Sequence, residues 1–452
     1  MGRLTEISAV LLCGGQSERM GFPKEMLRVD GAPLAVHMVR RLEGLFEKVF
    51  VSTNHPAYLR HLLGVSVLED EVPGAGPLAG ILTGLRRCGT RQVFFLACDM
   101  PTVHNDAVQT LLDRALGSDA PAVCARCGGA PQPLCGVYAA SIAPAVEQAV
   151  QQGADRSVQS LLGSVGAQWV ELPAFGDVDA PEDLAVLGEV FREVEPLPVR
   201  RAPVRRLGGA PLEQDTVAEE WPVTVLANGV RLATVLCTPT ALRELAAGFA
   251  AYLGLLSSRG GLRSVAVDYE ARRVRLELEA DEARIRSAVQ QLVSSACGAA
   301  LHGTLPPPVD IRGEHADVRV SRSHLLECVR GLREMAPVFA RTGCTHQAAF
   351  SDGQRVRIFY EDVGRHNAMD KVIGRALMDG VDLSSGVLVS TGRLGSEVVV
   401  KALRQGVPVL AAPSAVTAAA VHLAVRHGLT LVGFARASRV NVYAGAQRVR
   451  DA

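Results

Sequence analysis

The first 190 residues alternate short apolar runs with amphipathic stretches, and this rhythm constrains the fold more than any other feature of the chain. A strand, a covering helix and a further strand in this order build a largely parallel sheet with helices on both faces. We therefore predict an α/β fold for this half. The predicted strands are 7–12, 48–53, 65–70, 92–98, 120–125 and 134–139, and the predicted helices are 34–46, 105–116 and 141–152.

The stretch 193–214 breaks the rhythm, because it is rich in proline, arginine and glycine and has no periodicity. This composition is typical of a linker. It separates a first domain at 1–192 from a second at 215–452, which opens with two hairpin patterns. The second domain is predicted to be mixed α/β, with helices at 240–253, 281–293, 323–335, 366–378, 396–405 and 415–427 and strands at 387–391 and 407–411.

The overall composition excludes several classes of function. The 452 residues carry equal numbers of acidic and basic side chains, so no bulk charge attracts nucleic acid or a membrane surface. No stretch reaches the roughly 18 apolar residues of a membrane span, and no signal peptide opens the chain. The scattered cysteines form no disulfide framework. We expect a soluble cytoplasmic protein that binds neither nucleic acid nor membrane.

The stretch "LLCGGQSERMGFPKEML" at 11–27 is the first with a chemical signature. Gly14 and Gly15 follow an apolar strand, and Arg19 and Lys24 come soon after. Backbone N–H groups beside glycines can approach a phosphate, whose charge the two cations neutralise. The pattern is not a P-loop, since no Lys-Ser/Thr pair follows the glycines. An ordinary tight turn is the alternative interpretation.

The strand in "QVFFLACDMP" ends at Asp99. Ligands of open α/β sheets bind outside the carboxyl ends of the strands, so Asp99 and the glycine loop are expected to share one crevice. A carboxylate beside bound phosphates suits Mg²⁺, and a turn or helix-capping aspartate is the alternative. Asn54, Asp70, Asp177 and Asp179 fit the same crevice.

The glycine loop, Lys24, "GPLAG", "CDMP", "QPLCGVY" and "DVDAPEDL", in this order, resemble the molybdenum cofactor guanylyltransferases over nearly all of residues 5–190. The resemblance implies a Rossmann-like nucleotidyltransferase that moves GMP from GTP onto molybdopterin with Mg²⁺. Asp99 would hold the metal, and Lys24 would neutralise the leaving pyrophosphate. The GTP-binding residues implied are Leu12, Cys13, Gly14, Lys24, Asn54, Asp70 and Asp99.

Two features of this half depart from the family or stay open. Cys13 stands where the family usually has alanine, which is a near-isosteric change. A cytidylyltransferase on the same fold is the alternative function, because the choice of base depends on backbone contacts that the sequence does not reveal.

The stretch "EDVGRHNAMDKVIG" at 361–374 holds the densest group of polar residues in the second half. His366 and Asp370 are four positions apart on a predicted helix and so share one face. A solvated helix start is the alternative, although such a start seldom mixes these residue types so tightly. Further on, Arg393 and Gly395 open a helix after a strand, an arrangement suited to an anion.

These segments, with 217–249 and "GFARASRVNVY", resemble the formate dehydrogenase accessory sulfurtransferases over about 215–450. The resemblance implies a cytidine-deaminase-like fold, without deaminase chemistry because no H-x-E or P-C-x-x-C motif is present in this half to bind zinc. Members of that family take sulfur as a cysteine persulfide from a cysteine desulfurase. They pass it to the bis-guanine-dinucleotide molybdenum cofactor before that cofactor enters formate dehydrogenase.

The same resemblance implies that one segment contacts the guanine nucleotide of the cofactor, and it makes the second domain a candidate for homodimer formation. The residues of that segment are Phe434, Ala435, Arg436, Ala437, Ser438 and Arg439.

The stretch "SSACGAALHG" places Cys297 among small residues, which leave a thiol uncovered. The family loop reads C-G-x-C. Its first cysteine matches Cys297, while its second matches Ala300. One thiolate is enough to hold a persulfide, so Cys297 is the predicted sulfur carrier, with Cys328 and Cys344 as candidate partners. An inert, buried small residue is the alternative.

The fusion carries its own prediction. Guanylylation makes the dinucleotide cofactor, and the second half handles that dinucleotide, so one chain joins consecutive steps and raises the effective concentration of the intermediate. We predict a bifunctional enzyme, a nucleotidyltransferase and a sulfurtransferase. The alternative for the second half is a non-catalytic escort that binds the cofactor and apo formate dehydrogenase.

Overall fold

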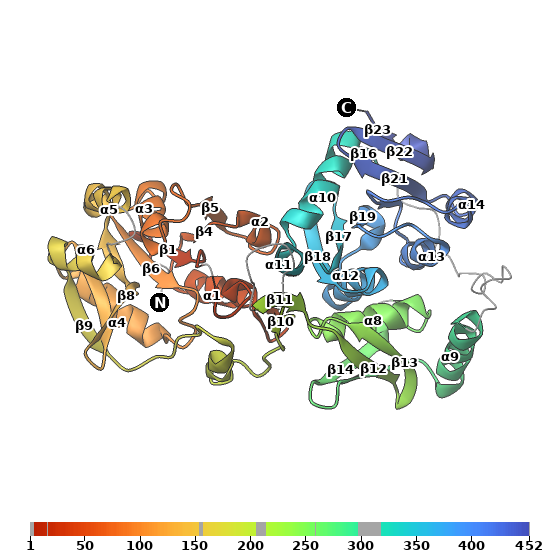
Figure 1. Ribbon diagram of the computed structural model, residues 1–452, viewed down its shortest axis with the longest axis horizontal. Helices are drawn as coiled ribbons and strands as arrows, with labels where there is room; N and C mark the ends of the chain where they lie inside the picture. Colours follow the sequence, from red (N-terminus) through yellow and green to blue (C-terminus); the bar gives the residue numbers. More distant parts are fainter. Residues whose placement is uncertain are drawn as a thin grey trace. The chain divides into compact units, whose positions relative to one another are not determined.

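The computed structural model describes residues 4–15, 17–152, 157–204, 214–257, 259–296 and 318–451, with only the backbone of 291–296. The chain divides into two compact units, residues 1–195 and 196–452 (Figure 1). Both units mix helices and strands, as predicted.

In the described part of the first unit, seven strands form one sheet in the order β5-β4-β1-β6-β8-β7-β9. The strands β1, β4, β5 and β6 are parallel to their neighbours in this set, whereas β8 runs antiparallel to both β6 and β7. The reversal arises because β7 and β8 form a hairpin whose turn residues, Gly128 and Gly129, both have positive φ. The predicted parallel sheet is confirmed except at β8. The strands are β1 (Ile7–Leu12), β4 (Val49–Thr53), β5 (Ser66–Glu69), β6 (Gln92–Ala97), β7 (Ala122–Cys127), β8 (Ala130–Ala139) and β9 (Gln168–Leu172).

Helices cover both faces of this sheet. Phe94 and Phe95 are consecutive on β6 and so point to opposite faces. Phe95 lies in the apolar core that α3, α5 and α6 share with the sheet, while Phe94 stacks on Phe46, which follows α1. The larger helices are α1 (Leu34–Glu43), α3 (Pro77–Arg87), α4 (Asn105–Leu116), α5 (Ala143–Gln151) and α6 (Val158–Val165). The short elements are β2 (Arg28–Val29), β3 (Ala32–Pro33), α2 (Pro56–Leu59) and α7 (Leu184–Leu187).

Helix α3 is an element that the sequence analysis missed. Its opening "GPLAG" was considered only as part of the crevice, although a proline in the first turn is a signal for the start of a helix. Gly76, the residue before Pro77, has φ of 61°.

The second unit contains two large sheets within its described residues, besides two sheets of two strands each. A four-stranded sheet has the order β13-β12-β15-β14, and a six-stranded sheet has the order β18-β17-β19-β20-β21-β22. The strands are β12 (Trp221–Ala227), β13 (Val230–Cys237), β14 (Leu262–Asp268), β15 (Arg273–Leu278), β16 (Val320–Ser321), β17 (His346–Ser351), β18 (Val356–Asp362), β19 (Val387–Ser390), β20 (Val409–Ala411), β21 (Thr430–Arg436), β22 (Arg439–Ala444) and β23 (Val449–Arg450). The helices are α8 (Leu242–Tyr252), α9 (Glu282–Ala296), α10 (Arg322–Glu334), α11 (Pro337–Thr342), α12 (Arg365–Asp379), α13 (Ser396–Arg404) and α14 (Ala418–Arg426).

The side chains of β17 alternate between two cores. Ala348 and Phe350 pack in the core that joins the four-stranded sheet, α8 and α12 to one face of the six-stranded sheet. Ala349, between them, packs on the opposite face with α10. Sequence analysis predicted most of these helices but missed β17, β18, β21 and β22.

Helices α8 and α12 approach each other closely because glycines lie at their contact. A Cβ added at Gly248 would lie 1.9 Å from Asp370 O, and one added at Gly374 would lie 1.9 Å from Glu244 O. This packing holds α12, which carries His366, Asp370 and Lys371, against α8.

The stretch 193–214 contains regular structure. Strand β10 (Val199–Pro203) pairs antiparallel with β11 (Gln214–Ala218), from Val199 opposite Ala218 to Pro203 opposite Gln214. The boundary between the two compact units falls between Glu195 and Pro196. The prediction of an irregular linker over 193–214 is therefore wrong for its described residues, which include paired strands.

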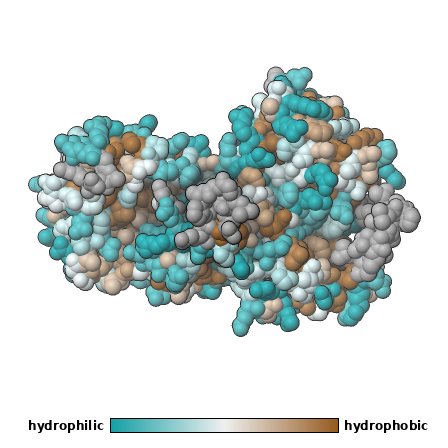
Figure 2. Space-filling view, in the orientation of Figure 1, coloured by the Kyte–Doolittle hydropathy of each residue, from teal (hydrophilic) through white to brown (hydrophobic). Residues whose placement is uncertain are grey.

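Polar and apolar residues are interspersed on the viewed face of each unit (Figure 2). The exposed large apolar side chains belong to separate elements, for example Leu116 at the end of α4 and Leu236 on β13. Within the described ranges, every helix is too short or too polar to traverse a lipid bilayer.

Candidate functional site

A cavity of about 330 Å³ lies at the carboxyl ends of the parallel strands of the first unit. Leu12 ends β1, Ser52 is near the end of β4, and Ala97 ends β6, so the carboxyl ends of three neighbouring strands supply its floor. This is the edge at which the sequence analysis expected a ligand. Of the predicted residues, Leu12, Cys13, Gly14, Lys24, Asp70 and Asp99 line the cavity.

Asn54 supports the glycine loop. Its Nδ2 donates a hydrogen bond to Gly14 O at 3.0 Å. A Cβ at Gly14 would lie 3.3 Å from both Asn54 Nδ2 and Asp70 Oδ2, so a larger residue would disturb both side chains. Asn54 Oδ1 is buried and has no hydrogen-bond partner among the described residues. Asn54, which was predicted to bind the nucleotide, therefore holds the glycine loop through Gly14.

Lys24 lies between two carboxylates. Its Nζ donates a hydrogen bond to Asp99 Oδ2 at 3.0 Å and a second one to Asp179 Oδ1. Arg19 reaches Asp179 at 3.8 Å. Burial lowers the pKa of Lys24, but Asp99 and Asp179 together outweigh burial and raise it overall. Lys24 is therefore a stable cation in the lining of this cavity.

Asp70 and Asp177 are carboxyl groups whose environment disfavours ionisation. Burial raises the pKa of Asp70, and a hydrogen bond that Ser52 Oγ donates to Asp70 Oδ1 offsets part of the rise. Burial, followed by the nearby charges of Asp99 and Asp179, raises the pKa of Asp177 to about 6. Asp177 Oδ1 is buried without a partner in the described structure.

The oxygen atoms that line this cavity suit a divalent cation that is held partly by the protein and partly by the phosphates of a bound substrate. Among the described residues, no group of three or more His, Cys, Asp or Glu side chains is arranged to hold a metal ion. Mg²⁺ commonly takes only one or two protein carboxylates and completes its shell with phosphates and water. Asp99, whose carboxylate lines the cavity, fits that requirement.

Cys98 is a cavity residue that the sequence analysis did not single out. It follows β6 as Cys13 follows β1, and both line the cavity. Burial, followed by the interaction with Cys98, raises the pKa of Cys13 well above its usual value. The strand register would have placed the two cysteines together, had the pairing of β1 with β6 been predicted.

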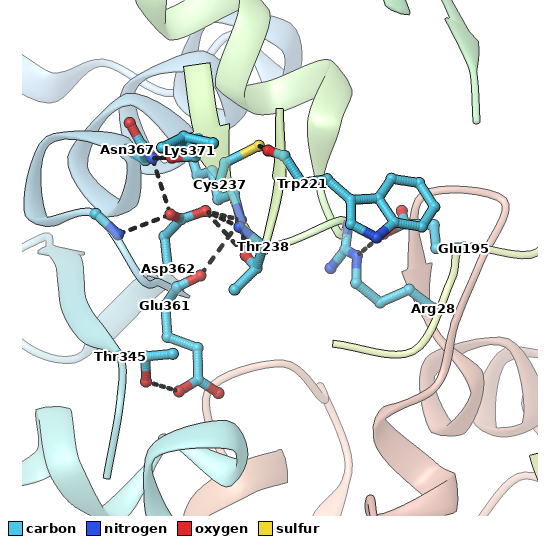
Figure 3. Close-up of polar contacts among 12 residues, drawn as sticks. Arg28, Glu195, Trp221, Cys237, Thr238, Thr345, Glu361, Asp362, Asn367 and Lys371 are labelled. Carbon is cyan, nitrogen blue, oxygen red and sulfur yellow. Dashed lines mark hydrogen bonds and ion pairs between the residues drawn. The ribbon is translucent and has the colours of Figure 1, made fainter. Parts of the chain in front are cut away.

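The second unit holds a fully buried ion pair. Lys371 Nζ lies 2.6 Å from Asp362 Oδ2, and both side chains are 0% exposed. Thr238 donates to the same carboxylate oxygen from its backbone N and its Oγ1, at 3.1 and 2.9 Å. Asn367 Nδ2 and Gly364 N donate to the other oxygen, each at 2.9 Å. Figure 3 shows the Asp362 carboxylate at the centre of these groups.

Several polar residues of the predicted cluster therefore have structural roles. Asn367 Nδ2 also donates to Leu236 O at 2.7 Å, which ties α12 to the strand β13. Glu361 accepts hydrogen bonds from Val338 N at 2.8 Å and Thr345 Oγ1 at 2.7 Å, so its carboxylate sits at the start of α11.

A second buried pair joins α12 to α13. Lys401 donates to Asp370 Oδ1. The Lys401 Nζ also lies 4.3 Å from the centroid of the Tyr252 ring. Burial raises the pKa of Asp370, and Lys401 offsets part of that rise. Asp370 and Lys401 therefore stabilise the packing of α8, α12 and α13.

His366 remains accessible at the start of α12. Its Nε2 lies 3.4 Å from Glu397 Oε2, while its Nδ1 is buried without a partner among the described residues. Burial, followed by the charges of Lys401 and Arg365, lowers the pKa of His366 to about 4. His346 Nδ1 is 3.4 Å from Thr391 Oγ1, and burial also lowers its pKa. These two imidazoles are neutral near pH 7.

The segment Phe434–Arg439 spans the end of β21, the turn that follows it and the first residue of β22. Phe434 and Ala437 have positive φ, 52° and 53°, so the backbone is folded tightly there. The guanidinium carbons of Arg436 and Arg439 lie 5.7 and 4.7 Å from the Phe434 ring centroid. Both arginines are exposed. The predicted contact of this turn with a guanine nucleotide stays a prediction.

The predicted sulfur carrier, Cys297, and Ala300 lie outside the described residues. Of the two candidate partners, Cys344 is exposed and Cys328 is buried. Cys328 Sγ lies 3.3 Å from His324 Nε2, and burial raises the pKa of Cys328 to about 11. Cys328 therefore carries a protonated, poorly reactive thiol.

Comparisons with known proteins match the two halves of the chain to different families. Residues 9–167 match the MobA-like NTP transferase domain, and residues 218–450 match the FdhD/NarQ family. The sulfur carrier protein FdhD of Xanthomonas euvesicatoria is 36% identical over 269 residues, which are 57% of this chain and 94% of that protein.

Two solved structures also align with the chain. One is described as a formate dehydrogenase accessory protein of Desulfotalea psychrophila (25% identity, 56% of this chain and 98% of that chain, TM-score 0.45). The other is the molybdopterin-guanine dinucleotide biosynthesis protein A of Archaeoglobus fulgidus (23% identity, 40% of this chain and 97% of that chain, TM-score 0.36). The resemblances on which the two halves were predicted are confirmed by the family matches. The chain belongs to the FdhD/NarQ family and carries a MobA-like NTP transferase domain on its N-terminal side.

Proposed function

We propose that this protein matures a molybdenum cofactor in two consecutive steps in the cytoplasm. The first unit transfers GMP from GTP to the terminal phosphate of molybdopterin. The second unit carries sulfur on Cys297 to the resulting bis-guanine-dinucleotide cofactor before it enters formate dehydrogenase. The observation that carries the first step is the cavity that Lys24, Asp99 and the glycine loop form at the carboxyl ends of the strands.

The chemistry of the first step needs positioning and neutralisation of charge, because nucleotidyl transfer proceeds without a protein nucleophile. Lys24 is fully charged and placed to neutralise the pyrophosphate that leaves. Backbone N–H groups of the glycine loop approach the phosphates. Asp99 would hold Mg²⁺, which supplies further neutralisation of phosphate oxygens when it is bound.

The acceptor phosphate attacks the α-phosphorus of GTP, the bond to the bridging oxygen breaks, and pyrophosphate leaves. Asp99 and Asp179 hold the Lys24 ammonium in place during this exchange, since both accept hydrogen bonds from it. Preorganised charge of this kind lowers the barrier because it requires no rearrangement as the leaving group forms.

The experiment for the first step uses the full chain, molybdopterin and Mg²⁺ with GTP or CTP labelled at the α-phosphate. We expect label to enter the cofactor from GTP, with one pyrophosphate released for each transfer. If the protein transfers CMP from CTP at an equal or higher kcat/KM, the first unit is a cytidylyltransferase and not a guanylyltransferase. An absence of transfer from both nucleotides would overturn the proposed first step.

The second step begins with the Cys297 thiolate attacking the outer sulfur of a desulfurase persulfide. The sulfur–sulfur bond of the donor breaks, the desulfurase thiolate leaves, and Cys297 holds the outer sulfur. On transfer, that sulfur takes up two electrons from the metal of the cofactor and Cys297 returns as a thiolate. The support for this step is membership of a family whose relative is named a sulfur carrier protein.

Ala300 gives weight to the alternative that the second unit only escorts the cofactor, because the family loop has a second cysteine there. Incubation of the full chain with a cysteine desulfurase and cysteine separates the two functions. We expect mass spectrometry to find one added sulfur on the peptide that contains Cys297. Cys297→Ser should lose that sulfur and fail to support formate dehydrogenase activity. Cys344→Ser, a change at an exposed thiol, is the matched control and should keep both.

Persulfide on Cys344 alone, or full formate dehydrogenase activity with Cys297→Ser, would contradict the assignment. Cofactor binding and enzyme activation without any persulfide would favour the escort.

A further inference from the structure

Thr102 joins two segments of the first unit that lie far apart in the sequence. It follows Asp99 by three positions, and its side chain is buried. Its Oγ1 accepts a hydrogen bond from Gly176 N at 2.7 Å and donates one to Gly176 O at 3.1 Å. Thr102 is not among the described residues that line the cavity. Any effect of this hydroxyl on the chemistry therefore passes through the residues that it holds.

Backbone groups extend the same connection. Val178 N donates to Asp99 O at 2.9 Å, and Val178 is fully buried. Arg41 Nη1 donates to Pro101 O at 2.8 Å, which holds the segment after Asp99 against α1. These hydrogen bonds fix the two segments side by side.

The segment that Thr102 holds carries Asp179. Lys24 Nζ donates hydrogen bonds to Asp179 Oδ1 and to Asp99 Oδ2, so the two segments each supply one carboxylate to the same ammonium. Asp179 directly follows Val178, whose backbone is tied to Asp99. The place of the Lys24 ammonium therefore depends on how the two segments are joined.

We propose that Thr102 is a positioning residue for GMP transfer, whose hydroxyl fixes the segment 176–179 so that Asp179 and Asp99 together hold the Lys24 ammonium in the cavity. Without the hydroxyl, Lys24 keeps its charge but loses its fixed place. A preorganised charge lowers a barrier because it needs no rearrangement as the leaving group forms. The inference rests on the proposed function of the cavity, whereas the placement of Lys24 can be measured without it.

The kinetic test measures GMP transfer by the full chain at saturating Mg²⁺. Thr102→Val removes the hydroxyl and keeps the shape of the side chain, and it should lower kcat about tenfold or more. KM for GTP should stay within about threefold, because the charge on the pyrophosphate grows only in the transition state. Thr102→Ser keeps the hydroxyl and should retain kcat within about threefold. Thr110→Val is the matched control, because Thr110 is exposed on α4 and its Oγ1 donates to Asp106 O of the same helix.

A double variant shows whether Thr102 acts through Asp179. Asp179→Asn weakens the hold on Lys24 by itself, so adding Thr102→Val should lower kcat by less than about twofold further. A general loss of structure would instead lower kcat by the same factor in both backgrounds.

A spectroscopic test follows Lys24 directly and needs no transfer activity. The chain has only four lysines, Lys24, Lys48, Lys371 and Lys401, so lysine labelled with ¹³C at the ε-carbon gives four NMR signals. The signal that Lys24→Arg removes belongs to Lys24. We expect Thr102→Val to shift this signal and to leave that of Lys48 in place, whereas Thr102→Ser and Thr110→Val should shift neither.

Three results would overturn the proposal: an unchanged kcat in Thr102→Val, an equal loss of kcat in the Asp179→Asn background, or an unshifted Lys24 signal. If Thr102→Val does not fold, Thr102→Ala removes the same hydroxyl and is measured in the same way. If the parent chain transfers no GMP, the proposed function of the cavity fails. The Lys24 signal then still decides whether Thr102 places the ammonium.

Discussion

The buried ion pair of the second unit gives a quantitative prediction. Replacing Lys371 by methionine keeps much of its volume but leaves the Asp362 carboxylate in a place that is 0% exposed, without its cation. Breaking a buried pair by removing one partner costs about 3–5 kcal/mol, because an uncompensated charge remains. The hydrogen bond from Lys371 Nζ to Thr238 Oγ1, 2.6 Å long, is lost as well. We therefore expect the free energy of unfolding of this unit to fall by about 4 kcal/mol.

Fluorescence of one tryptophan isolates this unit in the full chain. The protein has two tryptophans, and Trp169→Phe leaves only Trp221, which is on β12 beside the network. In that background, we expect Lys371→Met to lower the guanidinium midpoint by roughly 1 M, for an m value of about 4 kcal/mol/M. Arg330→Met, which removes one cation from an exposed position of α10, is the control and should change stability by less than about 0.5 kcal/mol.

A double variant tests the reasoning more sharply. Asp362→Asn combined with Lys371→Met removes both charges, so it should be more stable than Lys371→Met alone. If Lys371→Met unfolds within about 1 kcal/mol of the parent, or if Asp362→Asn gives it no recovery, Asp362 does not depend on Lys371 and the argument fails.

Three further predictions follow from the two sites. Asp99→Asn should abolish GMP transfer at saturating Mg²⁺ while the melting temperature stays within about 3 °C, with exposed Asp119→Asn as the control; transfer at the parent rate would remove Asp99 from the site. Replacing both Arg436 and Arg439 by alanine should weaken the binding of GDP to the second unit at least tenfold. Calorimetry on the full chain measures this affinity, with Asp99→Asn present in both proteins to weaken the site of the first unit. An unchanged isotherm would refute the prediction. Because His366 titrates near 4 when folded and near 6.5 when unfolded, its contribution to stability is complete above pH 6.5 and is lost as the pH falls toward 4. His366→Gln should therefore flatten that part of the Trp221 unfolding profile, and an identical slope would contradict the buried, neutral imidazole.

The local pattern of the sequence was enough to predict the first unit and much of its site. Glycines after an apolar strand and an aspartate after another identify strand ends, and the parallel sheet brings such ends to one edge. Lys24, Asp70 and Asp99 were predicted on this basis together with the family resemblance, and all three line one cavity. Strand β18 and the turn-forming strands β21 and β22 were missed because short apolar runs next to polar residues do not distinguish strand from loop.

Residues 361–371 show the limit of the same reasoning. Their density of polar groups was unusual for a solvated helix start, and the sequence cannot tell which of them face the core. The structure buries Asp362, Lys371 and Asp370 as ion pairs and leaves His366 partly accessible at the start of α12. Burial depends on the close packing of α12 against α8. Gly248 and Gly374 permit this packing, although they are more than a hundred positions apart in the sequence.

The sequence by itself determined the two families, the strands β1, β4 and β6 that end at the cavity of the first unit, and Cys297 as the candidate sulfur carrier. Those features depend on residues close together in the chain, whose spacing follows the period of a strand or a helix. Only the tertiary structure decided which polar residues pair, because the partners Lys24 and Asp179, or Thr238 and Asp362, are more than a hundred positions apart. It also decided which strands are neighbours in each sheet, because strand order is set by the packing of the whole unit.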